Sequence, residues 1–155
     1  GMLPESAGME AQCPGDRMRT WNIGPRNVDS LEVAAIINWY GITDVADLLD
    51  SGPGTSGNFT EAWLGSSPDR RAVAERVSPL SYVRRDLPPV LSIHGDSDSI
   101  VPYSQGVRLH DALNGVGVSN QLITIEGGGH GGFSYEEMSG IYSEIQAFLQ
   151  QHDVN

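Results

Sequence analysis

Two short apolar segments, each followed by a turn that carries an ionisable side chain, constrain the fold of this chain more than any other feature. The first segment, 88–93, leads into Asp98, and the second, 121–125, leads into His130. Apolar side chains recur at helical spacing between them, over residues 104–113. Strand, helix and strand in this order form the crossover that joins two parallel strands, whose carboxyl ends open at one edge of a sheet. We therefore predict that Asp98 and His130 meet at that edge, where ligands bind in open α/β sheets.

An aspartate beside a histidine is an arrangement used in general acid–base catalysis. The carboxylate holds one tautomer of the imidazole and stabilises the imidazolium that forms when the ring takes a proton. We therefore predict that Asp98 and His130 are two of the three members of a hydrolytic triad.

At these residues the chain resembles the α/β-hydrolase superfamily. The segment 94–102 reads His-Gly-Asp-x-Asp-x-x-Val-Pro, and the segment 127–133 contains Gly-x-x-His-Gly-Gly-Phe. Both motifs are similar to those of a branch that holds bacterial carboxylesterases, feruloyl-esterase-like proteins and acylaminoacyl-peptidase-like proteins. Residues 33–41 resemble the strand that follows the nucleophile strand, so the resemblance covers roughly residues 33–150. It implies a truncated α/β-hydrolase fold: three α/β/α layers with a small parallel sheet of about three strands and flanking helices.

The resemblance also implies roles for single residues. It makes Asp98 the orienting acid and His130 the general base of a Ser-Asp-His triad, whereas Asp96 shapes the loop. The aromatic residues expected to contact the substrate, a small carboxylic ester in the complete protein, are Tyr40, Trp63 and Phe133. No cofactor and no metal are expected.

The nucleophile is the member of the triad that the sequence does not supply. It should stand in Gly-x-Ser-x-Gly, on a sharp turn between a strand and a helix. Around Ser6, the nearest match, only five residues precede the serine, Pro4 replaces a glycine, and Pro14-Gly15 interrupts the helix that should follow. We therefore expect the C-terminal part of a longer hydrolase, inactive by itself.

The pattern along the chain predicts one domain with an extension at its start. Residues 1–30 read as a loosely ordered N-terminal arm, and residues 31–155 as the C-terminal part of a single α/β-hydrolase domain. Within that part, residues 42–85 form a partial cap insertion. The expected elements are a strand at 33–40, helical pieces at 45–49, 62–64 and 70–77, and a closing amphipathic helix at 135–151.

Charge and composition bear on partners and location. The net charge is −11, and all nine basic residues are arginines, which disfavours binding to nucleic acid or to an anionic membrane surface. No apolar run approaches the roughly 20 residues that span a bilayer, so we expect a soluble protein, cytoplasmic or secreted. A single cysteine, Cys13, excludes an internal disulfide. In the superfamily that the chain resembles, the strand 33–40 pairs with the nucleophile strand, which we expect to be missing here. Because the bare edge carries no lysine or proline, we predict a homodimer through this edge or through an exchanged N-terminal arm.

Several other functions remain open on the sequence. A peptidase of the acylaminoacyl type and a non-catalytic assembly or interaction protein are both compatible with these motifs. Gly127-x-Gly129-x-x-Gly132 matches the letters of a dinucleotide-binding fingerprint, but only 23 residues follow it, too few for the rest of that unit. The turn at 96–98 opens like a calcium loop but lacks the glycine and the glutamate that such a loop needs.

The three other histidines are predicted to be structural. His94 precedes a glycine at a strand end and should be packed and hydrogen-bonded, whereas His110 and His152 should face solvent.

Overall fold

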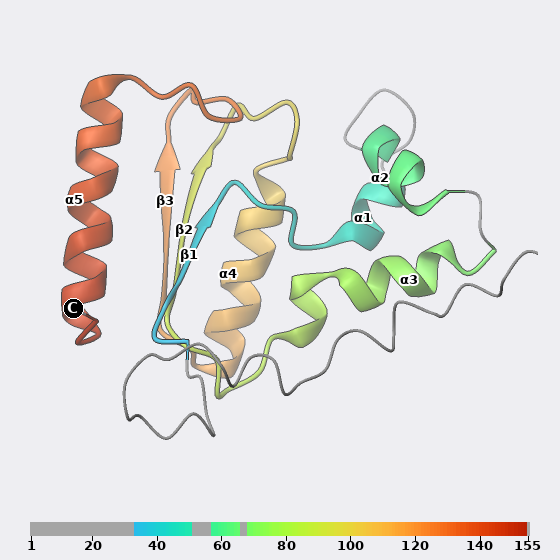
Figure 1. Cartoon of the computed structure of the whole chain (residues 1–155), viewed down its shortest axis with the longest axis horizontal. Coiled ribbons are helices and arrows are strands. Elements are labelled where there is room, and N and C mark those ends of the chain that lie inside the picture. The colour runs from blue at the N-terminus through green and yellow to red at the C-terminus, as the bar shows by residue number, and fades with distance from the viewer. Residues whose placement is uncertain (1–32, 51–56, 66–67, 155) are drawn as a thin grey trace, which may run out of the picture. The chain divides into compact units, whose positions relative to one another are not determined.

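A computed structural model describes residues 33–50, 57–65 and 68–154 (Figure 1). The predictions for the N-terminal arm, for Ser6 and for Cys13 concern residues outside these ranges.

Three parallel strands form the sheet of the described part (Figure 1), in the order β1-β2-β3. They are β1 (Ile36–Trp39), β2 (Val90–Gly95) and β3 (Asn120–Ile125). The predicted strand 88–93 begins two residues later in the structure, because Pro88 and Pro89 have no N–H to donate to a neighbouring strand. The predicted strand 33–40 is confirmed in a shorter form.

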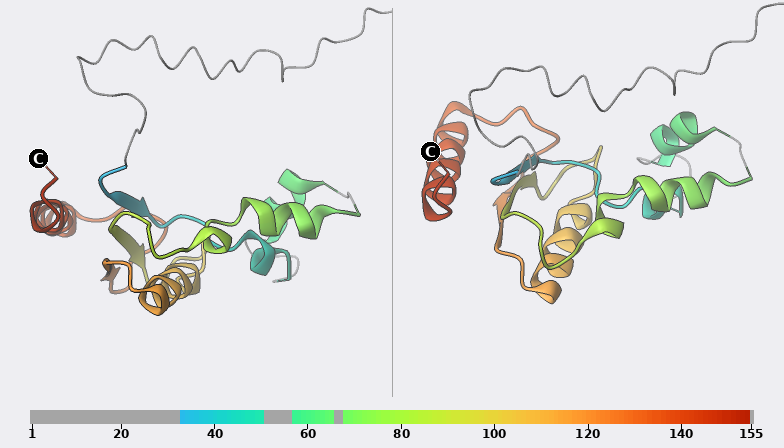
Figure 2. Two further views of the ribbon diagram at one scale, coloured as in Figure 1. Left: turned by 90° about the horizontal axis from the view of Figure 1, so that it is seen from below. Right: turned by 60° about the horizontal axis from the view of Figure 1, so that its bottom comes forward.

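Two helices cover opposite faces of this sheet (Figure 2). They are α4 (Ser104–Val116) and α5 (Tyr135–Gln151). Successive side chains of a strand point to opposite faces, so β2 contributes to two cores. Leu91 and Ile93 pack with Phe148 of α5, whereas Val90 packs with Leu113 of α4. The predicted three-layer α/β/α architecture is therefore present.

The closing helix has the bounds that its apolar spacing predicts. A capping box fixes its start: the Ser134 hydroxyl accepts the Glu137 N–H at 3.2 Å, and the Glu137 carboxylate accepts the Ser134 N–H at 2.6 Å. This cap determines where the loop that carries His130 ends.

The segment between β1 and β2 is helical and is attached to α4. It contains α1 (Val45–Asp50), α2 (Gly57–Leu64), α3 (Arg70–Val77) and the short 3-10 helix η3 (Pro79–Tyr82). The fully buried side chain of Gln105 on α4 accepts the N–H groups of Thr43 and Asp44, which fixes the start of α1. The short helix η3 contacts α4, and α1, α2 and α3 extend to one side of it (Figure 1). The bounds of α3 agree with the prediction, and the function of the segment as a partial cap stays a prediction.

Within the described ranges, no helix combines the length and the apolar character that crossing a membrane requires.

Candidate active site

The turn after β2 buries the Asp98 carboxylate and surrounds it with donors. The Asp98 side chain is fully buried. Its Oδ1 accepts the backbone N–H of Ile100 at 2.8 Å and that of Val101 at 2.9 Å. A short polar side chain that bonds the backbone two and three residues ahead stabilises a tight turn. The carboxylate is thus held in one orientation by its own loop.

The loop after β3 carries His130 and lies directly against the end of β2. A Cβ atom on Gly95 would lie 2.2 Å from the carbonyl oxygen of Gly128, a distance that no side chain tolerates. Asp96 ties the two loops together, because its carboxylate accepts the Gly127 N–H at 2.7 Å. This contact agrees with the loop-shaping role that we expected for Asp96. The close backbone approach brings the loop of His130 over that of Asp98.

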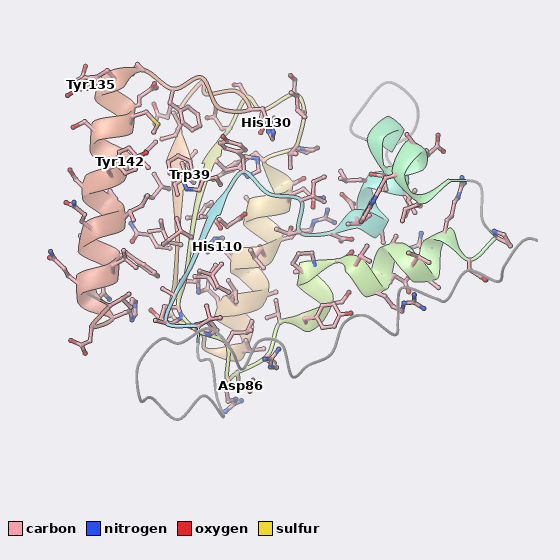
Figure 3. The ribbon with its side chains drawn as sticks, in the orientation of Figure 1. Trp39, Asp86, His110, His130, Tyr135 and Tyr142 are labelled. Carbon is pink, nitrogen blue, oxygen red and sulfur yellow. The ribbon has the colours of Figure 1, made fainter. Side chains whose placement is uncertain are left out.

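The two predicted residues are in direct contact. Nδ1 of His130 lies 2.8 Å from Oδ2 of Asp98, a hydrogen bond between the ends of neighbouring strands. His130 lies beyond the carboxyl end of the sheet (Figure 3), and its side chain is 29% exposed. Because the carboxylate can only accept, Nδ1 carries the proton and Nε2 keeps a lone pair. Among the described residues Nε2 has no hydrogen-bond partner, so it is available to take a proton.

Opposing effects act on the charge of Asp98. Burial by itself raises the pKa of this carboxyl group, but the hydrogen bonds from His130, Val101 and Ile100 lower it and outweigh burial. The net pKa of Asp98 lies below its ordinary value. The group is therefore ionised at neutral pH, as an acid that orients a histidine must be.

Of the three aromatic residues predicted to contact substrate, Tyr40 lies against His130 and Phe133 lies against Tyr40. The ring of Tyr40 packs on the imidazole with centroids 4.5 Å apart, and the ring of Phe133 lies 6.1 Å from that of Tyr40. Tyr40 reaches this position with a φ of 37°, a left-handed conformation that is uncommon for a residue other than glycine. The roles of Tyr40 and Phe133 in binding substrate stay predictions.

Trp63 occupies a different place. It lies on α2, is 65% exposed, and contributes to an open hollow of about 410 Å³. The other residues that line this hollow are Ile42, Val45, Thr60, Val77 and Pro79. The surface that Trp63 offers to a substrate therefore lies on the helical segment. Among the described residues no contact joins Trp63 to His130, and its role in binding substrate stays a prediction.

The predictions for the remaining histidines were partly wrong. His94 is fully buried and hydrogen-bonded, as predicted. His110, predicted to face solvent, is buried on α4, because Nδ1 bonds the Asn120 side chain at 2.7 Å where β3 begins. His152 is half-buried, since its ring packs on Phe148 and its Nε2 lies 3.1 Å from the Ser119 hydroxyl. The bonds of His110 with Asn120 and of His152 with Ser119 join residues 10 and 33 positions apart, which helical periodicity does not reveal.

The parallel sheet, its flanking helices and the acid–histidine pair at its carboxyl edge define the class of this protein: it has the fold of α/β-hydrolases. The chain belongs to the BD-FAE family, whose pattern it matches over residues 15–113, more than half of its length. Asp98 lies inside the matched range, and His130 lies beyond it.

Known proteins that resemble this chain are much longer. A truncated carbohydrate esterase from gut microbiota is 28% identical with a TM-score of 0.63, over 79% of this chain and 44% of that one. A puromycin hydrolase is 25% identical with a TM-score of 0.68, over 83% of this chain and 20% of that one. The non-reducing polyketide synthase pkbA of Emericella nidulans is 38% identical over 58 residues, which are 36% of this chain and 2% of the synthase. The chain thus spans less than half of each of these proteins.

Proposed function

We propose that this chain supplies the acid and the base of a Ser-Asp-His triad that hydrolyses carboxylic esters. The observation that carries the proposal is the 2.8 Å contact of His130 Nδ1 with the buried carboxylate of Asp98. A buried and ionised acid on one nitrogen, with a lone pair on the other, is what a histidine needs to activate a hydroxyl nucleophile.

The mechanism follows from this geometry. The serine oxygen attacks the ester carbonyl while its proton passes to Nε2 of His130, which gives a tetrahedral oxyanion and an imidazolium. Asp98 stabilises the imidazolium through the hydrogen bond to Nδ1 and stays ionised. The imidazolium then returns the proton to the leaving alcohol, and the acyl enzyme forms. In the second half, water attacks the acyl carbonyl while His130 takes a proton from it. The imidazolium then returns that proton to the serine oxygen as its bond to the acyl carbon breaks, which releases the carboxylic acid.

The nucleophile and the oxyanion donors lie outside the described residues in this proposal. No described hydroxyl group bonds Nε2 of His130. Accordingly we propose that the chain alone does not turn over esters through His130.

One of the similar solved structures supports an ester as the substrate. The carbohydrate esterase is among the more similar solved structures, at 28% identity. A peptidase is the second candidate, because the puromycin hydrolase and a puromycin-hydrolysing peptidase from Mycobacterium tuberculosis, the latter with a TM-score of 0.56, share the fold.

Substrate panels test the proposal. The chain should be expressed alone and together with the reading frame that precedes it in its gene, and each protein assayed with p-nitrophenyl acetate and with an acylated peptide. We expect ester hydrolysis by the longer protein only, abolished by His130→Gln. Hydrolysis of the peptide alone would assign the peptidase function. A folded longer protein without either activity would contradict the proposal and favour an assembly or interaction protein.

A further inference from the structure

A second histidine lies directly behind the acid of the pair. His94, at the end of β2, is fully buried. Its Nε2 lies 3.0 Å from the carbonyl oxygen of Val101 and 3.4 Å from Oδ2 of Asp98. A carbonyl oxygen and an ionised carboxylate can only accept, so the proton of His94 resides on Nε2.

Val101 connects this histidine to the acid. Its carbonyl oxygen accepts the His94 Nε2–H, while its own N–H donates to Oδ1 of Asp98 at 2.9 Å. His94 therefore fixes the residue whose amide orients the carboxylate. The other carboxylate oxygen, Oδ2, faces Nε2 of His94 and Nδ1 of His130.

The opposite side of the His94 ring faces Gly106 of α4. Nδ1 is buried and has no hydrogen-bond partner within the described ranges. Gly106 lies against this side of the ring, where a Cβ atom would lie only 3.2 Å from Nδ1. The Tyr103 ring packs edge-on against the imidazole at 5.7 Å. A proton on Nδ1 would be a buried donor without an acceptor, an unfavourable arrangement.

We infer that His94 is a positioning residue of the acid–base pair: fixed as the Nε2–H tautomer, it holds Val101 and Asp98 so that Oδ2 accepts from Nδ1 of His130. This deepens the proposed function and rests on it for its catalytic meaning. The positioning itself is measurable without turnover, so its failure and the failure of the proposed function are distinguishable.

A pair of variants separates the donor from the bulk of the ring. His94→Leu keeps a side chain of similar size and removes the donor, whereas the side-chain amide of His94→Gln can still donate to the Val101 carbonyl. Long-range ¹H–¹⁵N correlation spectra of the labelled chain show which nitrogen of each imidazole carries the proton. Hydrogen exchange reports the Val101 amide.

We expect the unmodified chain to show the proton on Nε2 of His94 and on Nδ1 of His130. His94→Leu should lose the Nδ1–H signal of His130 and exchange the Val101 amide at least about tenfold faster, because local opening becomes easier. His94→Gln should retain both properties. A His130 signal and a Val101 exchange rate unchanged by His94→Leu would overturn the inference. If His94→Leu does not fold, the unmodified chain decides: a proton on Nδ1 of His94 overturns the inference, and one on Nε2 supports it.

Discussion

At the scale of single residues, Asp98 combines full burial with a charge. Burial favours the neutral acid, and three hydrogen bonds reverse that preference and place its pKa below the ordinary value. Such a group stabilises the folded state above the pKa of the unfolded chain, near 3.9. That stabilisation is lost as the pH falls through the lower pKa of the folded state.

Replacing Asp98 should therefore cost stability in a pH-dependent way. We expect Asp98→Asn to lower the free energy of unfolding at pH 7 by about 1–3 kcal/mol, because its amide leaves the His130 Nδ1–H without an acceptor. The difference from the unmodified chain should shrink as the pH is lowered from about 5 towards 3. Denaturant titrations at several pH values measure it. Asp86→Asn, in an exposed pair with Arg84, is the control and should change stability by less than about 1 kcal/mol at every pH.

His110 gives the free energy of unfolding a second pH dependence, and here burial outweighs hydrogen bonding. Burial lowers its pKa, and the hydrogen bond that its Nδ1–H donates to the Asn120 side-chain oxygen, together with the charge of Asp111, offsets only part of that effect. The unfolded chain then takes up a proton near pH 6.5 that the folded chain refuses, so stability falls as the pH drops below that value.

The variant His110→Gln removes this titration. Its free energy of unfolding, relative to the unmodified chain, should improve below pH 6.5 by up to about 1.4 kcal/mol per pH unit, until the lower pKa of the folded state is reached. Denaturant titrations between pH 7 and pH 5 report this difference. A difference that does not change with pH would show that His110 is protonated as easily in the folded chain as in the unfolded one.

At the scale of elements, the contact between two strand ends creates the site. Gly95 ends β2 beneath the backbone of the loop that follows β3. Because the atoms that a Cβ would meet are backbone atoms, no side-chain rotation can relieve the clash. The position of His130 therefore depends on a glycine 35 residues before it.

Gly95→Ala should displace that loop. We expect a loss of stability of at least about 1–3 kcal/mol and loss of the His130 Nδ1–H signal, since overpacking moves the backbone. Gly115→Ala is the matched control, because a Cβ there meets no atom within 4 Å and the residue lies inside α4. It should raise stability by up to about 1 kcal/mol. Equal effects of the two substitutions would contradict the close approach.

Local sequence signals predict part of these elements, and contacts between distant segments determine the rest. Residues 70–77 and 135–151 form helices with the predicted bounds, because their limits are marked locally: Pro79 follows the first, and the second has regular apolar spacing and a cap at Ser134. The contact of Asp98 with His130 follows from strand order, which the crossover rule makes predictable. The burial of His110 and the left-handed Tyr40 do not follow, since each depends on packing between distant segments.

At the scale of the whole molecule, β1 is an outer strand of the described sheet. Ile36 donates its N–H to the carbonyl oxygen of Pro89, just before β2, at 2.9 Å, and Tyr40 donates to that of Ile93 in β2 at 2.8 Å. Alternation along a strand therefore directs the N–H groups of Ile37 and Trp39 away from β2. We propose that two copies pair through this edge, antiparallel across a two-fold axis, or exchange their N-terminal arms.

Light scattering at micromolar concentration tests this proposal. A homodimer has twice the 16.7 kDa of one chain, about 33 kDa. Ile37→Pro removes an outward donor without removing a bond to β2 and should give a monomer if the edges pair. Ile37→Ala loses the same side-chain packing, keeps the donor and should remain a dimer. A dimer that survives Ile37→Pro points to exchange of the arms, and a monomeric unmodified chain contradicts both forms.

The central claim is that Asp98 and His130 act as one catalytic unit, and kinetic coupling tests it most directly. The measurement is kcat/KM for p-nitrophenyl acetate in the longer protein, for Asp98→Asn, His130→Gln and the double variant. We predict that His130→Gln lowers kcat/KM by at least about a thousandfold and that adding Asp98→Asn lowers it no further, because residues that act as a unit are non-additive. Losses that multiply in the double variant, or a loss below about tenfold in His130→Gln, would contradict the claim.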